Sequence, residues 1–421
     1  MNKNETTNEA VPLFNRGLTS VALAQFFSAL ADNALLFAIL ALAIKLEYAS
    51  WIDPIFQLLF VGVYVITAPF VGSFADKFDK GKVMLISNGL KLVGSLLIFS
   101  GGNPFLGYVI VGLGAALYSP AKYGILGEVS HPGNLVKANG VIEASTIAAI
   151  LIGAIAGGFA ADHHTTFALG MCAALYFAAL IANLYIPKLP AKNIEMSWHP
   201  NTMCKNFIQS LKVLLSDIDA KVSLLGTSLF WGAGITLRFL LIAWVPYVLN
   251  VVDKTTPSIL NATVAIGIVI GSGLAAKFIT LEKAKLALYA GVLMGICVVI
   301  AMLIEVRPEV LADGITHNLE FWAIQQALIP IHAMLILIGI FGGVFIVPLN
   351  ALLQERGRDL IGVGKAIAAQ NFSENSMMLF MLVFYTLFHS LGMSPNIMGI
   401  GFGGIFAITI LIIIFKTMKN K

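Results

Sequence analysis

Long apolar runs recur along the whole chain, and they constrain its fold more than any other feature. Each run holds about 20 residues, the length that a helix needs to cross roughly 30 Å of hydrocarbon. Of the 421 residues, 58% are hydrophobic and 11% are charged, whereas soluble domains carry about 25% charged residues. Helices satisfy their own backbone hydrogen bonds in lipid. We therefore predict an all-α membrane protein.

The positions of breakers between the runs predict twelve transmembrane helices. The longest break, residues 188–221, contains Pro190 and Pro200 and suits a cytoplasmic linker with a partly amphipathic interfacial helix. It separates an amino-terminal six-helix half, 1–187, from a carboxy-terminal six-helix half, 222–421. The predicted spans are 18–44, 54–75, 83–101, 104–126, 138–161, 165–187, 222–250, 258–279, 284–304, 330–353, 366–389 and 397–415.

The distribution of lysine and arginine predicts the orientation in the membrane. With the amino terminus inside, the outer side keeps only Lys45, Lys254 and Arg307 of the 26 basic residues. Lys91 and Arg238 fall within spans, and the remaining 21 lie on the cytoplasmic side. Both termini are therefore expected to be cytoplasmic.

The two halves resemble each other in sequence, which indicates an internal repeat. The segment "SPAKYGILGEVSHPGNLVKANGVIEAS" aligns without a gap on "VPLNALLQERGRDLIGVGKAIAAQNFS", so that Pro120 matches Pro348 and Lys137 matches Lys365. Two parallel six-helix repeats, related by an axis along the membrane normal, are typical of secondary transporters with a site at the repeat interface.

Asp32 and Asn33 interrupt the apolar run "FSALADNALLF" near the middle of the first span. An unpaired charge there costs at least about 2.5 kcal/mol, and such charges in transporters usually line the substrate pathway. Arg238, the one arginine within a predicted span, is the expected partner of Asp32. The pair is expected to bind a ligand that carries both signs of charge; the alternative is a fixed ion pair that holds the halves together.

A second polar group lies in "AIAAQNFSENSMM", where Gln370, Asn371, Glu374 and Asn375 share one helix face. Asn371 and Glu374 are candidates for the central cavity. Because this group lies within two turns of the cytoplasmic helix end, hydrogen bonding at that end is the alternative.

Two further lysines fall within or near the spans. Lys122 follows Pro120, which opens its helix locally, so a phosphate contact is a candidate role. Lysines near helix ends also extend to the interface. For Lys91 in "NGLKLVG", such an extension or a structural role is favoured.

The segment "GSFADKFDKGK" joins the second and third spans on the predicted cytoplasmic side. Asp76, Lys77 and Lys80 in this segment are candidates for a charge network that latches helix ends in one conformation. A plain basic loop is the alternative.

Catalytic and metal-binding signatures are missing from the sequence. It has no G-x-S-x-G, H-E-x-x-H or phosphate-binding glycine loop, and its three cysteines share no metal-like spacing. We expect neither an enzyme nor a cofactor or metal. The net charge of +4 is small for this length and gives no support to nucleic-acid binding.

Several polar strings within the spans resemble a known family. "GSFADKFDKGK" between the second and third spans is similar to the loop of the major facilitator superfamily, although Asp79 stands where a glycine is usual and Gly81 where a base is usual. "AQFFSALADNALLFA", "AALYSPAKYGILGE", "GTSLFWGAGITLRFLL" and "AQNFSENS" resemble the bacterial lysophospholipid transporter family, LplT, over almost the full length.

This resemblance implies the major facilitator fold and movement of lysophospholipids, such as 2-acyl-glycerophosphoethanolamine, across the bacterial inner membrane toward the cytoplasmic leaflet. It also implies a functional partner, an Aas-type acyltransferase, and it carries the cavity charges onto Asp32 and Arg238. A proton-coupled exporter of drugs or small metabolites, with Asp32 or Glu374 carrying the proton, is the alternative function.

Overall fold

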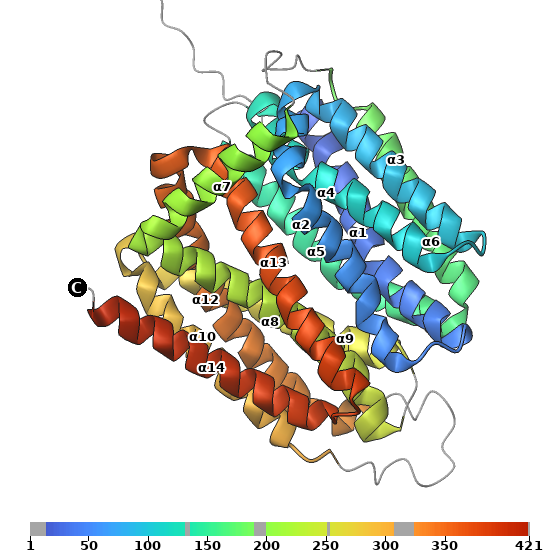
Figure 1. Cartoon of the computed structure of the whole chain (residues 1–421). Coiled ribbons are helices and arrows are strands. Elements are labelled where there is room, and N and C mark those ends of the chain that lie inside the picture. The colour runs from blue at the N-terminus through green and yellow to red at the C-terminus, as the bar shows by residue number, and fades with distance from the viewer. Residues whose placement is uncertain (1–13, 131–134, 189–198, 251–252, 307–323, 420–421) are drawn as a thin grey trace, which may run out of the picture.

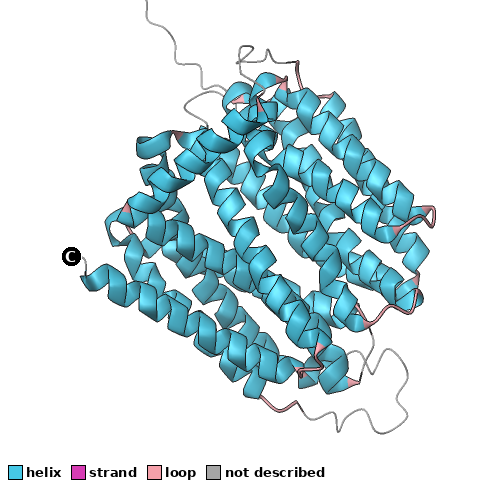
Figure 2. Ribbon diagram, in the orientation of Figure 1, coloured by secondary structure: helices cyan, strands magenta, loops and turns pink. Residues whose placement is uncertain are grey.

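The computed structural model describes residues 14–130, 135–188, 199–250, 253–306 and 324–419. Within these ranges every regular element is a helix (Figure 2). The first helices are α1 (Arg16–Lys45), η1 (Ser50–Ile52), α2 (Asp53–Lys77), α3 (Lys80–Phe99), α4 (Pro104–Val129), α5 (Leu135–His163) and α6 (Thr165–Leu184). The rest are α7 (Pro200–Ser216), α8 (Ile218–Leu249), α9 (Thr255–Phe278), η3 (Leu281–Leu286), α10 (Ala287–Leu303), α12 (Ile329–Ile361), α13 (Val363–Ser390) and α14 (Pro395–Lys419).

Each of the twelve predicted spans coincides with one long helix, and the predicted fold class is confirmed. Among the described residues, ten helices are long and apolar enough to cross a membrane. The other two expected spans are α5, whose apolar part is described over Ala148–His163, and α13, which carries the polar row around Glu374. Polar side chains, not a lack of length, set α13 apart.

Several of the long helices, among them α1, α3, α4 and α8, begin where a short polar side chain caps a first-turn N–H group. The side chain of Asn15 accepts a hydrogen bond from the Leu18 N–H at 2.8 Å, at the start of α1. Asp217 does the same for α8, with the Ala220 N–H at 2.9 Å. Each cap satisfies donors that the helix itself leaves unpaired.

The helices fall into two groups that follow the chain (Figure 1). In the first group α1 packs on α5 and α6, and α4 packs on α2 and α3. In the second group α12 packs on α8, α9 and α10, and α10 also packs on α14. Glycines permit the closest approaches inside the groups: a Cβ added to Gly157 would lie 2.5 Å from Ala34 of α1, and one added to Gly271 would lie 2.0 Å from the Ile340 oxygen of α12.

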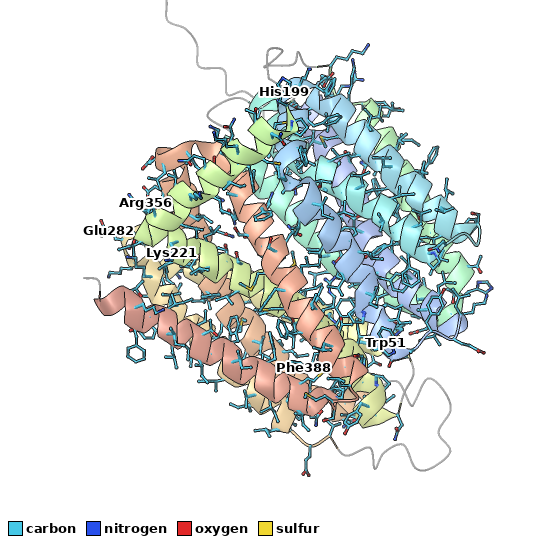
Figure 3. All side chains as sticks on the ribbon, viewed as in Figure 1. Trp51, His199, Lys221, Glu282, Arg356 and Phe388 are labelled. Atoms are coloured by element: carbon cyan, nitrogen blue, oxygen red, sulfur yellow. The ribbon has the colours of Figure 1, made fainter. Side chains whose placement is uncertain are left out.

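Two helix pairs join the groups: α2 packs on α13, and α5 packs on α9. The connecting helix α7 contacts α2, α8, α12 and α13 at one end of the bundle (Figure 1). Figure 3 shows Lys221, Glu282 and Arg356 at that end, and Trp51 and Phe388 toward the opposite end. The end that carries α7 is the one predicted to be cytoplasmic.

Candidate functional site

Asp32 lies in the middle of α1 and is the centre of a polar network inside the first group of helices. One carboxylate oxygen, Oδ2, lies 2.7 Å from Nζ of Lys91 on α3. The other, Oδ1, accepts a hydrogen bond from the Tyr176 hydroxyl of α6 at 2.8 Å. Three helices therefore meet at this carboxylate, and its charge is compensated within the group.

The expected pairing of Asp32 with Arg238 was wrong, because Asp32 pairs with Lys91 instead. The Lys91 side chain is 2% exposed and that of Asp32 is 25% exposed. Lys91 does not extend to the interface. Its helix α3 packs on α4 and α6, and the Lys91 side chain is buried. Of the two interpretations of Lys91, extension to the interface was therefore wrong.

The Lys91 ammonium has further polar and aromatic neighbours. Its Nζ donates to the Ser28 hydroxyl at 2.9 Å and lies 5.3 Å from the ring centroid of Tyr118. Ser28 in turn donates to Asn88 at 2.8 Å, and Asn88 donates to Asn183 at 2.6 Å. Sequence reasoning missed these residues, although Asn88 and Lys91 stand three apart on a predicted helix, a spacing that places them on one face.

Arg238 lies in the middle of α8 and reaches toward the first group of helices. Its Nη2 donates to Oδ1 of Asn33 at 3.4 Å, a long hydrogen bond. The Asn33 amide nitrogen is held by the Ala29 carbonyl at 2.8 Å, so the amide oxygen is the atom directed at Arg238. Among the side chains that the structure describes, Arg238 has no ion-pair partner. Within the described part of the chain, a long hydrogen bond from Asn33 is thus the polar contact that the structure gives this cation.

The remaining predicted site residues lie on other helices. Lys122 is buried on α4, two residues after Pro120, which lies inside that helix. Glu374 is buried on α13, where Oε1 accepts a hydrogen bond from Gln370 at 2.7 Å. Gln370 also donates to Asn350 of α12 at 2.8 Å. Asn371 is half-buried on the same helix.

The predicted latch residues lie at the end of α2 and the start of α3. Lys80 is 5% exposed and forms an ion pair with Glu128 at the end of α4, at 2.7 Å. This pair stays within the first group of helices. Lys77 is half-buried on α2, and the side chain of Asp76 lies outside the described residues.

At the opposite end of the bundle, Asp162 near the end of α5 contacts the start of α9. Its Oδ1 accepts a hydrogen bond from the Lys254 N–H at 2.6 Å, and Oδ2 accepts from the Thr255 N–H at 2.7 Å. Lys254 Nζ also lies 3.8 Å from the Asp53 carboxylate at the start of α2. A Cβ added to Gly158 would lie 2.4 Å from the Ser258 hydroxyl, so only glycine allows this approach.

Comparison with known proteins places this arrangement in one class of membrane protein. Residues 21–379 match the model of the Major Facilitator Superfamily. The fold resembles the nucleoside transporter NupG, with a TM-score of 0.68 at 13% identity over 95% of this chain and 99% of that one. It also resembles the peptide transporter POT in complex with sulfate, with a TM-score of 0.71 at 13% identity over 97% and 96% of the two chains. The chain is a transporter of the major facilitator class.

Relatives with higher sequence identity identify the family within this class. The chain is 50% identical over 406 residues to the "Lysophospholipid transporter LplT" of Klebsiella pneumoniae, covering 96% of this chain and 97% of the relative. It is 53% identical over 384 residues to the protein of the same name from Serratia proteamaculans, covering 91% of each. The Escherichia coli protein of that name is 50% identical over 406 residues. The chain belongs to the LplT family of the major facilitator superfamily, as its polar strings had indicated.

Proposed function

We propose that this protein moves lysophospholipids across the bacterial inner membrane, toward the cytoplasmic leaflet, and that Arg238 binds the substrate phosphate. The relatives carry the name of this cargo at 50% identity over nearly the whole chain, which favours it over a drug or metabolite exporter. The observation on which the phosphate contact depends is the guanidinium of Arg238 beside Asn33, which has no ion-pair partner among the described side chains. A guanidinium matches the geometry of phosphate oxygens.

We assign the other predicted site residues to further contacts with the substrate. Asn33 stands beside the guanidinium and offers a polar edge to the glycerol or head group. Lys122 is proposed as a second phosphate contact, and Asn371 and Glu374 as polar contacts on α13. Asp32 is 25% exposed, but the ammonium of an ethanolamine head group meets its carboxylate only in competition with Lys91.

The transport cycle that we propose is alternating access between the halves 1–187 and 222–421, with 188–221 as the cytoplasmic linker and both termini cytoplasmic. The single acyl chain enters laterally between helices, because it requires an apolar path. In this proposal the cytoplasmic latch consists of Asp76, Lys77 and Lys80. The buried ion pair with Glu128 would hold the Lys80 side chain in place.

A separate Aas-type acyltransferase is the proposed functional partner. It would consume the transported lysophospholipid at the cytoplasmic leaflet by re-acylation. This step removes the product of transport and thereby favours inward movement without a covalent step in the transporter itself.

Uptake of labelled lysophosphatidylethanolamine by spheroplasts tests the proposal. Arg238→Ala is expected to lower uptake at least about tenfold, because truncating one partner of a buried charge contact costs about 2–5 kcal/mol. Asp32→Ala is expected to abolish it as well. The matched control is Arg358→Ala, which removes an arginine with a 62% exposed side chain at the end of α12 and should leave uptake unchanged. Normal uptake by folded Arg238→Ala protein would remove the role assigned to Arg238.

A further inference from the structure

The buried Lys91 ammonium is the charge partner of Asp32. Its side chain is 2% exposed, so no bound lipid reaches it. It nevertheless lies 2.7 Å from Asp32, whose side chain is 25% exposed. An effect of Lys91 on a substrate would therefore pass through Asp32.

The formal charges of Lys91, Asp32 and Arg238 do not sum to zero. Lys91 and Asp32 cancel each other at 2.7 Å, and Arg238 has no ion-pair partner among the described side chains. The three residues together carry one net positive charge. Without Lys91, the formal charges of Asp32 and Arg238 would sum to zero, and the partly exposed Asp32 carboxylate would have lost its ammonium partner.

The arrangement of the neighbours keeps Asp32 committed to Lys91. Tyr176 donates to the second carboxylate oxygen at 2.8 Å, and Ser28 accepts from the Lys91 ammonium at 2.9 Å. The rings of Tyr118 and Tyr176 lie 5.3 and 5.9 Å from that ammonium, within the range of a cation–π contact. A substrate ammonium would have to displace a lysine held by all of these groups.

We propose that Lys91 is a specificity-determining positioning residue: by neutralising Asp32, it makes the site select the phosphate of a lysophospholipid and disregard a head-group amine. This inference rests on the proposed function and names the chemistry that the site reads. A net positive site accepts an anionic head group such as phosphoglycerol at least as well as the zwitterionic phosphoethanolamine. Specificity of this kind depends on the charge that is left unpaired.

The test is competition binding with purified protein in nanodiscs, which needs no turnover. Lysophosphatidylethanolamine and lysophosphatidylglycerol each displace a fluorescent lysophospholipid, and the ratio of their half-displacing concentrations is measured. Lys91→Met should shift this ratio about tenfold toward the ethanolamine lipid, a factor that corresponds to about 1.4 kcal/mol. Asp32→Asn, which leaves Lys91 uncompensated, should shift it in the opposite direction. Lys91→Arg should keep the wild-type ratio.

A matched control separates charge selection from damage to the fold. Lys254→Met removes a lysine that is also buried, with an 8% exposed side chain, and that also faces a carboxylate, at 3.8 Å from Asp53; it should leave the ratio unchanged. An unchanged ratio in folded Lys91→Met and Asp32→Asn proteins would overturn the proposal. If Lys91→Met does not fold, the ratio measured with Asp32→Asn tests the proposal by itself, and an unchanged ratio would overturn it. Failure of the wild-type protein to bind either lipid would instead overturn the proposed function.

Discussion

The carboxylate of Asp162 on α5 accepts hydrogen bonds from both the backbone N–H and the hydroxyl of Thr255 on α9, at 2.7 and 2.5 Å. Thr255 is the first residue of α9, where unpaired N–H groups and the helix dipole favour a negative charge. The contact joins the two groups of helices where α5 ends and α9 begins. Alternating access between two repeats requires contacts of this kind to break and reform.

Asp162→Ala is expected to open this end of the protein more often, because the first N–H groups of α9 lose their acceptor across the interface. The reporter is Ser258→Cys, at a position that is 0% exposed beside Gly158. A membrane-impermeant maleimide should label it several times faster in the Asp162→Ala protein. Cys204, the half-exposed native cysteine, is replaced by serine in both proteins. Equal labelling rates would contradict the prediction.

Gly158→Ala should act in the same direction through steric overlap. The added Cβ would lie 2.4 Å from the Ser258 hydroxyl and 2.6 Å from the Lys254 carbonyl, so α5 and α9 must separate. Since the overlap affects the reporter serine directly, Ala262→Cys, which is 4% exposed on α9, replaces it here. The control is Gly273→Ala on α9, the helix of the reporter cysteine, where the new Cβ has nothing within 4 Å. This variant should label at the wild-type rate.

Glu128→Gln should destabilise the first group of helices by about 3–5 kcal/mol, because it leaves the Lys80 ammonium buried without its charge partner. The side chains of the pair are 6% and 7% exposed. Thermal unfolding in detergent measures the loss. The double variant Lys80→Met/Glu128→Leu removes both charges and should recover most of the stability; a double variant as unstable as the single one would show that the pair is not the cause.

Acid should weaken the contact between Asp217 and Arg356 at the predicted cytoplasmic end. The hydrogen bond from Arg356 lowers the pKa of Asp217 below its ordinary value of 3.8. A carboxyl with a lowered pKa stabilises the fold above its unfolded pKa, and this contribution disappears as the pH falls through the folded pKa. Wild-type protein should therefore melt above Asp217→Asn by a constant margin near neutral pH, and the margin should shrink below about pH 4. A margin that is constant down to pH 2 would argue against the contact.

Sequence reasoning recovered the site only in part, and Gly153 and Gly157 show why. A spacing of four residues places both on one helix face and permits close helix packing, and a Cβ on Gly153 would lie 2.6 Å from the Leu30 carbonyl. The neighbouring Gly158, which carries no such motif partner, is the glycine that faces α9. A spacing pattern shows that a helix face is small, but it contains no information about which helix covers that face.

The sequence alone was enough to predict that this chain crosses the membrane as helices and that it belongs to the LplT family. Length, hydropathy and the order of residues are local quantities, and the membrane acts on them directly. Which charges pair could be learned from the three-dimensional structure alone. Asp32 and Lys91 are 59 positions apart, and Lys80 and Glu128 are 48 apart. Each pair depends on which helices are neighbours and on how each is rotated about its axis, because an ion pair in lipid requires contact within a few ångströms.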